Sequence, residues 1–162
     1  MSEALRIEIL SPPEITNWDE VAKLRFEELD RRYRWNWSTP SERDLNPQAR
    51  HILAYRGEEY VGGGRLTPDE TPGAEAGRWL VGRFVAKYQH QGIGTEMYRA
   101  TENEAKQQGA TSLILESVPE PETIKFYKKR GYEKTGIKEA PNIDGGVVEC
   151  TVMVKELTNV KA

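Results

Sequence analysis

Hydrophobic and polar residues alternate with a period of two over residues 5–10, Leu-Arg-Ile-Glu-Ile-Leu. This alternation predicts a β-strand, because successive side chains of a strand point to opposite faces of the sheet. Further alternating stretches, and short apolar runs bounded by turn residues, recur along the chain. We expect strands over residues 5–10, 51–55, 60–66, 78–86, 112–118, 132–137 and 147–157.

Helical spacing of apolar residues occurs between the strands. After Asn17, which can cap a helix, apolar residues recur mostly every three or four positions, at Val21, Leu24, Phe26 and Leu29. Pro121 suits the first turn of a helix, and a glycine commonly follows a helix end. We therefore expect helices from Asn17 to near Tyr33, from residue 95 to about 108, and from Pro121 to Gly131.

The order of these elements predicts the fold class. A β-rich first half is followed by β-α-β-α-β-β, which indicates an α/β sandwich with a mixed sheet. Residues 35–47 are expected to form an ordered loop or short helix, and residues 67–77 a loop rather than a domain boundary. A length of 162 residues fits one domain, so we expect a single domain over residues 1–162.

Composition narrows the class of protein. Charged residues make up 30% and hydrophobic residues 37%, and no stretch approaches the roughly 20 apolar residues of a membrane span. The N-terminal residues lack the pattern of a signal peptide, so we expect a cytoplasmic protein without a membrane partner. The net charge of −3 gives no basic footprint for nucleic acid.

Cysteine and histidine are scarce. Cys150 is the single cysteine, which excludes an intramolecular disulfide, and its alternating context favours packing over a nucleophilic role. The two histidines, His51 and His90, stand far apart and show no ligand spacing, so we expect no metal.

Three consecutive glycines, residues 62–64, lie within a predicted strand. Glycine weakens a strand interior unless a bulge forms there or another group approaches closely. The sequence leaves two interpretations open, a bulge and the wall of a ligand site.

The run Gln89-His90-Gln91-Gly92-Ile93-Gly94 joins a predicted strand to a predicted helix. The first amides of a helix lack internal partners and carry partial positive charge, so such a turn can bind an anion. Glycines at 92 and 94 allow a diphosphate to approach the amides of residues 92, 94, 95 and 96. A purely structural turn is the alternative. A P-loop is absent, and Met97 stands where a Rossmann fingerprint requires glycine.

Two motifs in order resemble the GNAT superfamily of acetyl-CoA-dependent N-acetyltransferases. Its Arg/Gln-x-x-Gly-x-Gly/Ala motif is matched by Gln89, Gly92 and Gly94, and its Phe-Tyr-x-x-x-Gly-Phe motif by residues 126–132, Phe-Tyr-Lys-Lys-Arg-Gly-Tyr. The resemblance is clearest from residue 78 to 134. It implies a GNAT fold, in which helices flank a mixed, mostly antiparallel sheet whose parallel central strands splay apart.

The resemblance also implies where acetyl-CoA binds. Its diphosphate would lie on the glycine turn, and its pantetheine arm would pair with backbone groups of Phe84 and Ala86, with amides near Phe84 and Val85 polarising the thioester carbonyl. Many relatives have an asparagine where this chain has Glu120, which puts one cofactor contact in doubt. The implied turn residues are Gln89, His90, Gln91, Gly92, Ile93, Gly94, Thr95 and Glu96.

Acetyl transfer to an amine requires a proton donor for the departing thiolate and a base for the amine. Tyr127 suits the donor because a phenol of pKa about 10 is protonated at pH 7 and is close in acidity to a thiol. Glu116, at the end of a strand, is the candidate base, as a glutamate there is in some relatives. The alternatives are a core aromatic at 127 and an ordinary solvated glutamate at 116.

Two rival functions stay open. The first 85 residues also resemble acyl-homoserine-lactone synthases, through Arg25-Phe26, the tryptophans, Glu42-x-Asp44, residues 65–68 and Trp79-x-x-x-Arg83-Phe84, but Leu80 replaces that family's strand glutamate. A domain that binds acyl-CoA without turnover, or that pairs through its sheet edge with a partner, is the other rival. Separately, a homodimer is one expected assembly. The expected acceptor is a small-molecule or peptide amine of unspecified identity.

Overall fold

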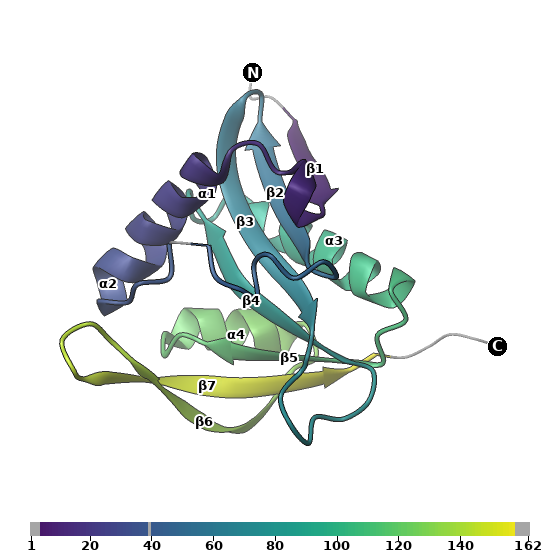
Figure 1. Cartoon of the computed structure of the whole chain (residues 1–162), viewed down its shortest axis with the longest axis vertical. Helices are drawn as coiled ribbons and strands as arrows, with labels where there is room; N and C mark the ends of the chain where they lie inside the picture. The colour runs from purple at the N-terminus through teal and green to yellow at the C-terminus, as the bar shows by residue number, and fades with distance from the viewer. Residues whose placement is uncertain (1–3, 39, 158–162) are drawn as a thin grey trace.

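The computed structural model describes residues 4–38 and 40–157, whose strands form one seven-stranded sheet in the order β1-β2-β3-β4-β5-β7-β6 (Figure 1). Neighbouring strands run antiparallel except for the parallel pair β4 and β5. The mixed, mostly antiparallel sheet is therefore confirmed. The strands are β1 (Leu5–Leu10), β2 (Arg50–Arg56), β3 (Glu59–Pro68), β4 (Arg78–Ala86), β5 (Ser112–Ser117), β6 (Glu133–Pro141) and β7 (Val147–Glu156).

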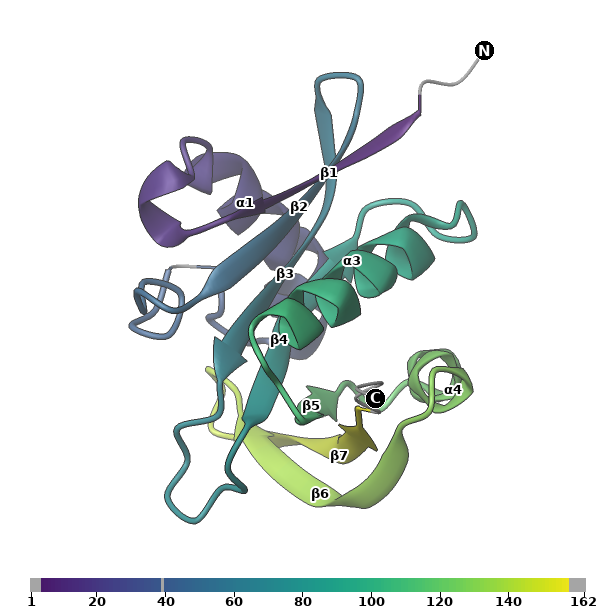
Figure 2. The same ribbon diagram turned by 90° about the vertical axis from the view of Figure 1, so that its right-hand side faces the viewer.

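Helices cover both faces of the sheet. One face carries a continuous helical segment made of α1 (Trp18–Arg25), the π-helical turn η2 (Phe26–Asp30) and α2 (Arg31–Tyr33); α3 (Ile93–Gln107) and α4 (Pro121–Lys129) lie on the other side (Figure 2). A short 3₁₀ turn, η1 (Pro12–Glu14), follows β1. None of the helices in the described part of the chain is long and apolar enough to cross a bilayer.

The first helix differs from its sequence prediction in three details. Phe26 is 47% exposed, because it lies two positions after the buried Leu24 and hence about 200° around the helix. Asn17 stands at the N-cap, but its side-chain amide donates to Glu20 (3.0 Å) and to the Tyr55 hydroxyl (2.9 Å) instead of accepting from the helix backbone. The π-helical turn had no signal in the spacing of apolar residues.

The sheet separates two apolar cores. The first lies between the sheet and α3, with Met97, Leu113 and Met153 fully buried, and the second lies beneath α1 and α2. Cys150 is buried in the second core, as the prediction of a packing role requires. Burial raises the pKa of its thiol to about 11, so the thiol is protonated at neutral pH.

The three glycines of β3 lie at irregularities of the ladder, where the register shifts between Ala54 and Tyr55 on one side and between Gly63 and Arg65 on the other. The bulge interpretation is therefore confirmed. Close packing also requires glycine here. An added Cβ would meet the Met97 side chain at Gly62, the Tyr60 hydroxyl at Gly63 and the Phe84 ring at Gly64.

The parallel ladder between β4 and β5 is short. It runs from the pair Arg78 and Ser112 to the pair Val81 and Leu115, and beyond it each strand continues without the other. A bulge in β4 at Arg83, whose φ is +52°, accompanies the separation. The backbone edge of residues 82–86 that faces β5 therefore has no strand partner, and the predicted splay of the central strands is confirmed.

Candidate active site

The glycine turn after β4 presents the amino end of α3. Gly92 is the N-cap with φ +77°, and a Cβ added there would meet open space. The first amide bonded within the helix is that of Glu96, which donates to the Gly92 carbonyl at 3.1 Å. The amides of residues 93–95 precede this bond, so they are the ones free to bind an anion.

Ion pairs and hydrogen bonds attach the turn to the hairpin between β2 and β3. The Glu59 carboxylate accepts from Lys87 Nζ (2.8 Å) and from the Tyr88 hydroxyl (2.6 Å). Arg56 donates to the Gln91 side-chain oxygen at 2.7 Å. These bonds hold the turn in place before any ligand binds, which lowers the entropic cost of ordering the turn on binding.

A cleft of about 660 Å³ opens in front of this turn, between the free edge of β4 and helix α4. Ten of the thirteen predicted site residues line it: Phe84, Ala86, Gln89, His90, Gln91, Gly92, Ile93, Gly94, Thr95 and Tyr127. Sequence reasoning did not assign seven other lining residues, namely Tyr88, Glu122, Thr123, Lys125, Phe126, Lys129 and Arg130.

Three predicted residues, Val85, Glu96 and Glu116, do not line the cleft. The Val85 side chain is buried in the second core on the opposite face of β4. Glu96 has its amide engaged within the helix, and its carboxylate pairs with Arg99 at 2.9 Å.

Glu116 lies on the face of β5 opposite the first core, because it follows Leu115, which is buried in that core. Its carboxylate accepts from Lys138 Nζ at 3.1 Å. The side chain of Glu116 therefore faces the side of the sheet that α1 and α2 cover, away from α3.

Tyr127 reaches the cleft from α4 and is 6% exposed. Its ring packs edge-on against Phe126 and Tyr132, with centroids 5.2 and 5.5 Å away. Burial raises the pKa of its phenol, and the charge of Arg130 offsets only part of this rise. No described residue is hydrogen-bonded to the hydroxyl.

Three basic side chains border the cleft, Lys125 and Lys129 of α4 and Arg130 at its C-cap. Arg130 stacks over the Phe126 ring at 3.6 Å and donates to the Thr95 hydroxyl at 2.8 Å. The spacing of 125 and 129 places both lysines on one side of the helix, a signal present in the sequence. The cleft thus combines a helix amino end with nearby cations, as an anionic ligand requires.

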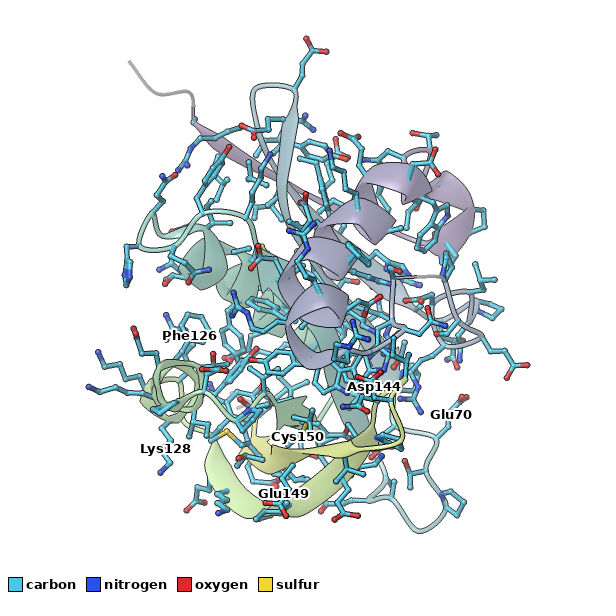
Figure 3. The ribbon with its side chains drawn as sticks, turned by 90° about the vertical axis from the view of Figure 1, so that its left-hand side faces the viewer. Glu70, Phe126, Lys128, Asp144, Glu149 and Cys150 are labelled. Carbon is cyan, nitrogen blue, oxygen red and sulfur yellow. The ribbon has the colours of Figure 1, made fainter. Side chains whose placement is uncertain are left out.

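The opposite side of the splayed strands is enclosed by α2 and the hairpin of β6 and β7. Arg34, the C-cap of α2, has φ +62° and donates to the Asp144 carboxylate through two bonds of 2.8 and 3.1 Å. Figure 3 shows Asp144 in the hairpin, close to the end of this helix. Tyr33 donates to Glu120 at 2.7 Å, so α2 also contacts the start of α4.

A buried cluster of three charged residues lies on this same side of the sheet. Asp44 is fully buried and accepts two bonds of 3.0 Å from Arg25 and a third, also of 3.0 Å, from Arg65. Burial alone raises the pKa of this carboxyl, but the two guanidinium groups outweigh it and hold the pKa far below its usual value. His51 is buried beside it, and its Nε2 lies 2.8 Å from the Asp44 carbonyl oxygen.

Sequence comparison relates the chain to acetyltransferases. A sequence model of the acetyltransferase (GNAT) family matches residues 13–132. YjcF of Bacillus subtilis, described as an uncharacterized N-acetyltransferase, is 30% identical over 112 residues, which are 68% of this chain and 73% of YjcF.

Solved structures share the fold. ElaA of Escherichia coli matches with a TM-score of 0.75 at 16% identity, over 94% of this chain and 100% of ElaA. An aminoglycoside 6′-N-acetyltransferase complexed with coenzyme A matches with a TM-score of 0.73 at 17% identity, over 97% of this chain and 99% of that one. Both matches extend over nearly the whole chain, so they share its overall fold.

Proposed function

Because the chain belongs to the acetyltransferase (GNAT) family and is an N-acetyltransferase of that family, we propose that it transfers the acetyl group of acetyl-CoA to a primary amine by direct attack. One observation carries the proposal: the free edge of β4, the amino end of α3 and the Tyr127 hydroxyl border the same cleft.

The cleft suits coenzyme A along its length. The diphosphate would accept from the amides of residues 93–95, with Lys125, Lys129 and Arg130 supplying nearby positive charge. The two amides of the pantetheine arm would bond the unpaired backbone of Phe84 and Ala86, as an added strand bonds a sheet edge.

The chemistry follows from this orientation. The neutral amine nitrogen attacks the thioester carbon and forms the C–N bond, and backbone amides near Phe84 and Val85 stabilise the developing oxyanion. Collapse of the tetrahedral intermediate breaks the C–S bond, and the thiolate takes the proton of the Tyr127 hydroxyl. The tyrosinate then recovers a proton from solvent, while the proton lost by the amine passes to the base.

We assign the base to Glu116, acting directly or through water. Its side chain faces α1 and α2, the side from which an acceptor would approach a thioester whose coenzyme fills the α3 side. Lys138 Nζ donates to this carboxylate at 3.1 Å and so positions it at the end of β5.

The test is thiol release by the full-length protein with acetyl-CoA and a panel of amines. We expect release above background with at least one amine. A protein that binds acetyl-CoA measurably but releases no thiol with any amine would be a binding module, and the proposal would be wrong.

A further inference from the structure

Arg83 occupies the bulge of β4, directly before the cleft-lining Phe84. Its side chain lies on the α1 and α2 side of the sheet, with the guanidinium carbon 4.0 Å from the centroid of the Trp37 ring. The residue is therefore one position from the cofactor cleft along the chain but faces the opposite side, where an acceptor would bind.

The stacking on Trp37 leaves the hydrogen-bond donors of Arg83 free. All five N–H groups lie in the guanidinium plane, whereas the indole contacts its face. Nε is buried, and within residues 4–38 and 40–157 no group accepts a hydrogen bond from it or forms an ion pair with the guanidinium. A buried donor without a partner is costly, so such a group is a strong binding site for an acceptor of hydrogen bonds.

Trp37 itself is held firmly. Trp35 stacks on it with ring centroids 3.8 Å apart and planes 13° apart, so the guanidinium takes the other face of the indole. The amide of Trp37 donates to the Asp30 carboxylate at 2.8 Å. The guanidinium plane is thus fixed before a ligand arrives.

The charges around Arg83 favour a ligand with negative charge. Three guanidinium groups, those of Arg25, Arg65 and Arg83, share this region. The Asp44 carboxylate is already bonded to the first two, and the Asp30 carboxylate is bonded to backbone amides of residues 37 and 38. Burial, together with the charges of Arg65 and Arg25, lowers the pKa of Arg83 to about 9. The group is still charged at pH 7, and an anion would relieve both effects.

We infer that Arg83 binds an oxyanion of the acceptor, so that the substrate is a primary amine that also carries a carboxylate or a phosphate. The inference rests on the proposed function and specifies its substrate class. A planar guanidinium with free in-plane donors binds either oxyanion through two parallel N–H···O bonds. This pairing orients the amine end of the molecule toward the thioester at the splay.

The experiment compares matched amines with and without the anion, by kcat/KM at saturating acetyl-CoA. Amino acids are paired with their primary amides in one arm, and phosphoethanolamine with ethanolamine in the other. We expect the wild-type protein to prefer the anionic member at least tenfold in one arm, which identifies the oxyanion. Arg83→Met should reduce this ratio to about one, and Arg83→Lys should give an intermediate value.

Arg99→Met is the matched control, because Arg99 is an exposed arginine of α3 outside the cleft, and it should keep the wild-type ratio. If the wild-type protein turns over amines but shows no preference for the anionic members, the inference is wrong and the proposed function still holds. This outcome is measured on the wild type, so it does not depend on whether Arg83→Met folds. An unchanged ratio in a folded Arg83→Met variant overturns it as well. Absence of turnover with every amine is the separate failure of the proposed function.

Discussion

The Tyr33 hydroxyl donates a 2.7 Å hydrogen bond to the Glu120 carboxylate, joining residues 87 positions apart in the sequence. Tyr33 ends α2 and Glu120 is the N-cap of α4, so the bond connects the helices of the two sheet faces across the open end of the splay. Glu120 stands where many GNAT enzymes have an asparagine that contacts the cofactor. In this chain the side chain at that position instead fixes the distance between α2 and α4.

Tyr33→Phe should therefore lower the free energy of unfolding by about 1 kcal/mol, because it removes a half-buried bond to a charged acceptor. Glu120→Gln should cost a similar amount, and the double variant less than the sum. Chemical denaturation of the four proteins measures the coupling, which we expect to be at least 0.5 kcal/mol. Strictly additive effects would show that the bond contributes nothing.

Gly92→Ala should weaken acetyl-CoA binding about tenfold or more. The added methyl projects into the open space before the helix amino end, and a non-glycine residue at φ +77° costs roughly 1 kcal/mol. Gly109→Ala is the matched control, because Gly109 has φ +85° and equally open surroundings at the other end of α3. Calorimetry with acetyl-CoA should separate the two variants, although both lose similar stability; equal affinities would remove the turn from the cofactor site.

Tyr127→Phe should lower kcat about 100-fold while leaving the affinity for acetyl-CoA nearly intact. Because burial raises the pKa of this phenol, its ionisation should cause no loss of wild-type activity below about pH 10. The raised pKa makes the phenol a weaker acid than a free tyrosine, but the thiolate that it protonates forms in the same desolvated cleft. A fully active phenylalanine variant would exclude the general-acid role.

Glu116→Gln tests the base. We expect kcat/KM for the amine to fall at least tenfold at pH 7 and to recover partly as the pH rises, because a larger fraction of the amine is then already neutral. Glu149→Gln serves as the control, since Glu149 is an exposed glutamate of the adjoining β7. If both variants retain wild-type pH profiles, the amine loses its proton without Glu116.

Asp44→Asn should destabilise the protein by about 3–5 kcal/mol, because it leaves two buried guanidinium groups without their carboxylate. The folded-state pKa of Asp44 is depressed, so its contribution is complete above pH 4 and is lost as the pH falls toward the folded pKa. Urea denaturation between pH 7 and pH 3 should show this loss in the wild type only. Carboxylates distant from Asp44 titrate in both proteins and cancel in the comparison.

Much of this architecture could be predicted from the sequence because local signals agreed with one another. The alternation in residues 5–10 predicted both ends of β1. The glycine turn and Tyr127 account for eight residues that line the cleft, and the GNAT resemblance added Phe84 and Ala86. Lys125, Lys129 and Arg130 were missed because charged residues on a helix usually face solvent, and only the packing of α4 against the turn brings them to the cleft.

The acceptor side could not be read from the sequence, because it is assembled from segments that are distant in the chain. Trp37 and Arg83 are 46 residues apart, and their contact depends on the bulge that gives Arg83 a positive φ. A bulge shifts which residues face each side of a strand, and alternation alone does not reveal it. That no described residue pairs with the Arg83 guanidinium is therefore evident from the structure and not from the sequence.

The short parallel ladder between β4 and β5 divides the sheet into two blocks, β1 to β4 and β5 to β7, which are joined more weakly than the strands within each block. The ladder between β4 and β5 has four paired positions, within residues 78–81 and 112–115, whereas every antiparallel pair of neighbouring strands has six to eight. A load that separates the two blocks therefore acts on few backbone bonds at once. Under such a load we expect the β4–β5 ladder to break first. A coenzyme bonded to the free edge of β4 would add hydrogen bonds next to this ladder for as long as it stays bound.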